Sequence, residues 1–205
     1  MRRRTSFSQF FLMRLPAVCL LVLFPSRAEA HLNSTGLGPV YDGVLHFLLS
    51  PEDLLPVVAL ALFAGLRGAA HGRAVMFVLP GAWLAGGFIG LTARTSGGTA
   101  LTCISFLVLG GLLAADAKLS LRATAVLAAV IGLLHGYLNG AAMGRPEVGA
   151  IALLGLVVAV FVLVVFAAAF AVPLHRHWTR IAVRVVGSWI TASGLLMLGW
   201  ALRRG

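Results

Sequence analysis

Residues 149–172 read GAIALLGLVVAVFVLVVFAAAFAV, a stretch that contains no charged residue and no proline. A helix of this length rises ~36 Å at 1.5 Å per residue, which is enough to cross the ~30 Å hydrocarbon core of a bilayer. The stretch also lacks the regular apolar–polar alternation of a strand in a membrane barrel. It therefore predicts a transmembrane α-helix.

Five other stretches of similar character are separated by charged residues and by glycine or proline clusters. Together the six predicted spans are 44–66, 74–93, 100–116, 123–143, 149–172 and 182–202. Because lipid offers no water to the backbone amide and carbonyl groups, each span is expected to be helical. We therefore expect an all-α, polytopic membrane helix bundle of about six transmembrane helices, with the lipid bilayer as its surroundings.

The composition is typical of a chain that lipid surrounds. Hydrophobic residues make up 60% of the sequence and charged residues 11%, whereas soluble domains carry roughly a quarter charged residues. The net charge of +10 is spread in short runs between apolar stretches. Nucleic-acid-binding proteins instead gather their basic residues in a patch or stripe, so we expect no nucleic-acid partner.

The N-terminus has the order of a secretory signal. Basic residues at positions 2–4 precede the apolar run 15–24, and Ala28-Glu29-Ala30 follows it. The apolar run is short for a span that needs ~20 residues. We expect cleavage after Ala30; an uncleaved signal anchor is the alternative.

Cleavage divides the chain into a signal peptide at 1–30, a short extracytoplasmic segment at 31–43 and a six-helix transmembrane domain at 44–205. It also makes His31 the new N-terminus. The terminal amine and the imidazole of His31 can then chelate a transition metal together, so His31 is a candidate metal ligand.

The loop charges predict an orientation. A processed N-terminus lies outside the cytoplasm, and six spans return the C-terminus to that side. Seven basic residues then fall on the inner side and four on the outer side, as the positive-inside rule requires. The inner ones are Arg67, Arg73, Lys118, Arg122, Arg176, Arg180 and Arg184, and the outer ones are Arg94, Arg145, Arg203 and Arg204. We expect a multi-pass protein of the bacterial inner membrane with both mature termini extracytoplasmic.

Ionisable side chains inside a bilayer are costly and are candidates for function by default. Asp42 and His46 are one helical turn apart, and His46 and Asp53 are two turns apart, so a continuous helix would place all three on one face. Glu52 adds a second carboxylate beside Asp53. Imidazole favours nickel, cobalt, copper or zinc over magnesium, so these four residues are candidate ligands for a divalent transition metal.

The same segment also has the pattern of a helix start. Ser50 would be the N-cap, Pro51 the first helical residue, and Asp53 the acidic member of a capping box. His46 would then lie in a separate, re-entrant segment. The two interpretations are compatible, because broken helices often build ion sites near the middle of a membrane.

A second polar pair lies in the predicted span 123–143, where His135 and Asn139 are one turn apart. Glycines 132, 136 and 140 recur at every fourth position beside them. Such a stripe lets helices approach closely, so helix packing explains the glycines. For His135 and Asn139 the alternatives are a metal-binding role and a buried histidine that is hydrogen-bonded to a neighbouring helix.

These two segments carry a family resemblance. The motif His-Pro-x-x-Gly-x-Asp-His aligns with 46–53, where Glu52 stands at the Asp and Asp53 at the second His. The motif His-Gly-x-x-His-Gly-x-Glu aligns with 135–142; His135 and both glycines match, while Asn139 stands at the second His and Ala142 at the Glu. With these two motifs, a signal peptide and about six helices, the chain resembles the HupE/UreJ family. Members of this family are small bacterial membrane proteins associated with nickel or cobalt supply to hydrogenase and urease.

The resemblance implies a membrane transporter, or permease, for a divalent transition metal, with Ni²⁺ or Co²⁺ as the ion moved or bound. The alternative is a non-transporting accessory protein that binds metal or a partner complex. We do not expect an enzyme, because none of Ser105, Ser188 and Ser193 lies in a Gly-x-Ser-x-Gly elbow or within a helical turn of a histidine. The sequence leaves a homo-oligomer open.

Overall fold

A computed structural model describes residues 35–93, 98–143 and 146–204. The chain divides into two units, Met1–Ala30 and His31–Gly205, and the description that follows concerns the second unit. The predicted signal peptide, its cleavage site and His31 lie outside the described residues.

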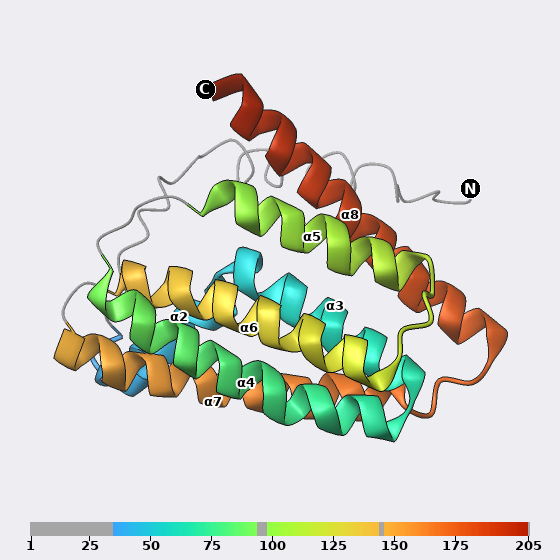
Figure 1. Cartoon of the computed structure of the whole chain (residues 1–205), viewed down its shortest axis with the longest axis horizontal. Coiled ribbons are helices and arrows are strands. Elements are labelled where there is room, and N and C mark those ends of the chain that lie inside the picture. The colour runs from blue at the N-terminus through green and yellow to red at the C-terminus, as the bar shows by residue number, and fades with distance from the viewer. Residues whose placement is uncertain (1–34, 94–97, 144–145, 205) are drawn as a thin grey trace, which may run out of the picture. The chain divides into compact units, whose positions relative to one another are not determined.

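Within the described ranges the regular structure is entirely helical (Figure 1), which confirms the all-α prediction. The helices are α2 (Pro39–Leu49), α3 (Pro51–Arg67), α4 (Ala69–Thr92), α5 (Thr99–Ala114), α6 (Leu121–Ala142), α7 (Pro146–Ala171) and α8 (His177–Arg204). The first of them begins at Pro39, inside the segment that was expected to precede the first span.

Four helices, α4, α6, α7 and α8, are long and apolar enough to cross a membrane. A fifth crossing is available if α2 and α3 count as one, but they meet at a 74° bend, as in a broken span or a re-entrant loop. The remaining helix, α5, has 16 residues and rises ~24 Å. A polytopic membrane bundle is therefore supported, while the predicted number of six spans is not confirmed.

The long helices run in alternating directions. Successive glycines of α6 face successive carbonyl groups of α4, which places α4 and α6 side by side and parallel. Gly65 of α3 faces Ala168 and Ala171, so the C-terminal ends of α3 and α7 lie together. Helices α5 and α8 are antiparallel, and they contact the other helices chiefly through α3. Alternation is what a chain that crosses a bilayer back and forth requires.

The α4–α6 contact depends on the glycine stripe that the sequence analysis singled out. A Cβ atom on Gly132, Gly136 or Gly140 would lie closer than 3.0 Å to the backbone of α4. Gly86 and Gly90 of α4 meet the backbone of α6 in the same way. Glycines on both helices therefore set their separation, which confirms the packing role that was expected of the stripe.

Replacing Gly136 with alanine should destabilise the bundle, because its new methyl group would meet the backbone of Trp83. Overpacking of this kind costs about 2–3 kcal/mol in the free energy of unfolding. Gly81→Ala is the matched control: it lies in α4 with nothing within 4 Å of the added Cβ, and alanine favours a helix by about 1 kcal/mol. Unfolding in mixed micelles, followed by circular dichroism, measures both. Equal stability of the two variants would contradict this account of the packing.

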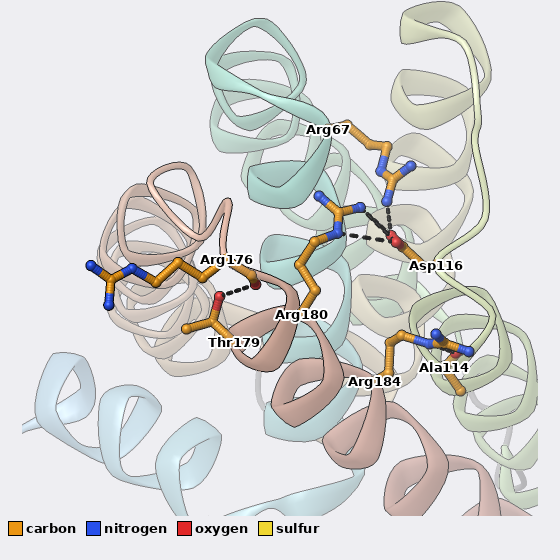
Figure 2. Close-up of polar contacts among 7 residues, drawn as sticks. All are labelled: Arg67, Ala114, Asp116, Arg176, Thr179, Arg180 and Arg184. Carbon is orange, nitrogen blue, oxygen red and sulfur yellow. Dashed lines mark hydrogen bonds and ion pairs between the residues drawn. The ribbon is translucent and has the colours of Figure 1, made fainter.

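One end of the bundle gathers the basic residues; we call it the basic end. Here α3, α5 and α7 finish and α4, α6 and α8 begin. Asp116, in the loop after α5, receives hydrogen bonds from Arg67 and Arg180 (Figure 2). Its backbone has φ of 50°, a left-handed conformation that aspartate tolerates better than most residues. Through these two arginines Asp116 joins α3 to α8.

One of the two arginines paired with Asp116, Arg67, is buried. The Arg67 side chain is 8% exposed, whereas those of Asp116 and Arg180 are 22% and 29% exposed. Arg184 makes a different contact, in which its Nε donates to the carbonyl oxygen of Ala114 at 2.8 Å. The Asp116 carboxylate therefore compensates mainly for the burial of Arg67.

Asp116→Asn removes the negative charge and keeps a side chain that suits the left-handed backbone. We expect it to lower the free energy of unfolding by about 2–3 kcal/mol, because the buried Arg67 loses its counter-ion. The control Arg184→Gln removes an exposed guanidinium and should cost less than about 1 kcal/mol. The same unfolding measurement applies, and an Asp116→Asn variant as stable as wild type would show that the pair contributes nothing.

Candidate functional site

His135 is the centre of a buried polar cluster. It lies on the α6 stripe beside Gly136, and its side chain is 1% exposed. Its Nδ1 lies 2.8 Å from Oδ1 of Asp53, and its Nε2 lies 3.0 Å from Oγ of Ser105. The three side chains come from α6, α3 and α5, so the imidazole joins three helices inside an apolar bundle.

Asp53 uses both carboxylate oxygens within this cluster. Oδ1 faces His135, and Oδ2 accepts a hydrogen bond from Nδ2 of Asn139 at 2.9 Å. The residue is 5% exposed, and a buried carboxylate is tolerable only when such partners replace water. Helix α3 does begin at Pro51, as predicted, but the Ser50 side chain makes no capping hydrogen bond. The Asp53 carboxylate therefore binds α6 rather than closing a capping box.

Asn139 links the cluster to α2. Its Nδ2 also donates to the carbonyl oxygen of His135 at 2.9 Å, and its Oδ1 lies 3.1 Å from Nε2 of His46. Because Oδ1 can only accept, Nε2 of His46 must carry the hydrogen, and in the neutral ring Nδ1 then has a lone pair. His46 thus reaches Asp53 and His135 through the Asn139 amide, across the break between α2 and α3.

Ser105 belongs to the cluster, although the sequence analysis did not predict it. Its hydroxyl can donate to the carbonyl oxygen of Thr102 at 2.8 Å or to Nε2 of His135. In the first case the His135 ring donates from both nitrogens and is an imidazolium; in the second it is neutral. No local pattern marks Ser105, because it lies on another helix, 30 residues away from His135.

The order Ser105, His135 and Asp53 is the order of groups in serine hydrolases. The histidine that was sought within a turn of a serine is therefore supplied by another helix. Ser105 is nevertheless 1% exposed and already hydrogen-bonded, so its oxygen offers no approach to a substrate carbonyl. The arrangement is compatible with a buried polar network and does not provide an accessible nucleophile.

Trp83 of α4 covers the cluster and was also missed from sequence. Its ring lies 5.4 Å from that of His135, tilted by 34°, and makes an edge contact with Phe47 at 6.2 Å. Within the described part of the chain its indole nitrogen has no hydrogen-bond partner. Fourteen residues, or ~21 Å, separate Trp83 from the start of α4 at Ala69. The cluster is therefore deep within the bundle.

Two of the predicted ligands, Glu52 and Asp42, are not brought to the cluster. Glu52 is exposed, although it adjoins Asp53. Asp42 accepts hydrogen bonds from the backbone nitrogen and the hydroxyl of Thr35, at 2.5 and 2.7 Å. His31 lies outside the described residues. Across the residues that the structure describes, no group of three His, Cys, Asp or Glu side chains is close enough to hold a metal ion.

Comparison with known proteins confirms the resemblance. A family model described as "HupE / UreJ protein" matches residues 19–197. The match covers most of the chain, which therefore belongs to the HupE/UreJ family, a family associated with nickel and cobalt handling. No curated protein and no solved structure matches the chain. Residues of both motif segments, His46 and Asp53 from the first and His135 and Asn139 from the second, meet in the cluster.

Truncation of Asp53 tests whether the cluster stabilises the fold. Asp53→Ala leaves the buried donors of His135 and Asn139 without an acceptor, so we expect a loss of about 2–4 kcal/mol in the free energy of unfolding. Glu52→Ala changes the same kind of side chain at the adjacent, exposed position and should stay within about 0.5 kcal/mol of wild type. Similar losses in the two variants would mean that burial of Asp53 has no energetic consequence.

Proposed function

We propose that this protein is a membrane transporter for a divalent transition-metal cation, with nickel or cobalt as the ion. One observation carries the proposal: His46, Asp53 and His135 are distant in sequence but converge on one buried cluster inside an apolar bundle. Ionisable groups at such a depth are costly and are retained for function. Membership of a family associated with nickel and cobalt handling supports the same ions.

The donor set suits such an ion. Imidazole nitrogens favour the later first-row divalent metals, and a carboxylate supplies negative charge. In its neutral form His46 offers a lone pair on Nδ1, while Ser105 holds the ring of His135 and Asn139 holds the carboxylate of Asp53. We propose that the hydrogen-bonded cluster is the ion-free state. A cation would enter between His46 and Asp53 and replace the Asn139 bridge, and its release would restore that bridge.

The proposal places the chain in the bacterial inner membrane. The bent pair α2–α3 and the helices α4 to α8 would provide six crossings after removal of residues 1–30. The basic end would face the cytoplasm, since Asp116 is the one acidic residue that the described part of the chain contributes there. Both mature termini would then be extracytoplasmic. The sequence has no Gly-x-x-x-x-Gly-Lys-Ser/Thr loop, which supports transport driven by a gradient rather than by this chain's own nucleotide hydrolysis.

Metal uptake into proteoliposomes tests the function directly. We expect the wild-type protein to move Ni²⁺ or Co²⁺, and His46→Ala or His135→Ala to lower the rate at least about tenfold, since a lost ligand costs more than 1.4 kcal/mol in binding. His71→Ala is the matched control, because His71 hydrogen-bonds the carbonyl oxygen of Leu119 at the basic end, away from the cluster. Its rate should stay close to that of wild type.

Two outcomes would overturn the proposal. If no first-row divalent metal crosses the membrane faster than through protein-free vesicles, the chain is not a transporter. If the purified protein binds metal through His46 or His135 but moves none, it is a non-transporting accessory protein. Equilibrium dialysis with ⁶³Ni on the same preparation distinguishes the second result from the first.

A further inference from the structure

A groove opens between α4 and α7 at the basic end. Its volume is about 350 Å³, within the ~300–1,000 Å³ of small-molecule sites. Gly72 and Met76 of α4 form one wall, and Ala168 and Ala169 of α7, with Val172 directly after that helix, form the other. The seven residue-to-residue steps from Val165 to Val172 give this second wall a length of ~10 Å. Small side chains on both walls leave this space open between two helices that pack together.

Among the described residues, Arg73 is the only charged one that lines the groove, and it lies in the first two turns of α4. It is exposed, and it forms no ion pair with any carboxylate of the described residues. The remaining lining residues are apolar. A ligand that matches both the Arg73 guanidinium and the apolar lining of the groove must carry an anionic group beside a hydrocarbon segment.

The excess of positive charge around the groove favours an anionic ligand. Lys118, Arg122 and Arg176 also lie at this end of the bundle. The sole carboxylate that the described chain places there belongs to Asp116, which is already bonded to two arginines. Basic pockets between helix ends are typical binding sites for anionic lipid headgroups. A second copy of this chain would bring the same excess of positive charge and would be repelled.

We propose that the α4–α7 groove is a binding site for an anionic phospholipid. The phosphate pairs with the Arg73 guanidinium, and the first part of an acyl chain lies along the apolar wall between Met76 and Ala169. The site is separate from the buried cluster, so the lipid is a structural ligand of the bundle and does not contact the proposed metal path. The proposal does not rest on transport activity.

Native mass spectrometry of the full chain in detergent measures the binding. The protein is titrated with phosphatidylglycerol and with phosphatidylcholine of identical acyl chains. We expect phosphatidylglycerol to be retained more strongly, and Arg73→Gln to weaken its binding about three- to tenfold. Arg122→Gln is the matched control: it removes the same charge from an exposed position in the first turn of α6, outside the groove. It should change the affinity less than twofold.

A second variant tests the apolar part. Ala169→Trp fills the groove from an exposed position and should reduce the binding of both lipids, while circular dichroism confirms that the variant is folded. Equal losses from Arg73→Gln and Arg122→Gln would overturn the proposal in favour of diffuse electrostatic attraction. Equal retention of the two lipids, or no effect of Ala169→Trp, would also overturn it. So would a lipid-free dimer that Ala169→Trp abolishes, since a second copy would then occupy the groove.

Discussion

The carboxylate of Asp53 imposes the strongest constraint on this bundle. A charged oxygen pair deep among apolar helices is stable only where donors replace water. Those donors are Nδ1 of His135 and Nδ2 of Asn139, both on α6. The requirement fixes the rotation of α6 against α3, and through Asn139 it also holds His46 on the other side of the helix break. A single buried acid thus relates three elements to one another.

Close backbone packing makes that geometry attainable. His135 can reach Asp53 while its ring lies against Trp83 because Gly132 and Gly136 let α6 approach α4. The glycine stripe and the polar cluster occupy adjacent positions of the same helix, so packing and chemistry are coupled. At the basic end Asp116 plays a related part, since it joins the ends of α3 and α8 through two arginines. Polar contacts at two depths therefore stabilise a bundle whose core is otherwise mainly apolar.

Sequence patterns identified much of the cluster. His46, Asp53, His135 and Asn139 were all predicted, since each is a polar residue in an apolar stretch and lies in one of the two segments that align with the family motifs. Ser105 could not be found in this way, because a serine that hydrogen-bonds within its own helix has no distinctive spacing. Trp83 resembles any other apolar residue until its contact with His135 is known. Glu52 was grouped with Asp53, but successive residues of a helix point about 100° apart.

The sequence by itself determined that the chain forms apolar helices of membrane type, because hydropathy and length depend only on local composition. It also marked the residue types able to bind a transition metal. Only the tertiary structure decided that Asp53 is buried while Glu52 is exposed, that α2 and α3 are separated by a 74° bend, and that Ser105 joins His135. These features depend on how each helix is rotated against its neighbours. That rotation follows from packing between distant segments, so local sequence does not specify it.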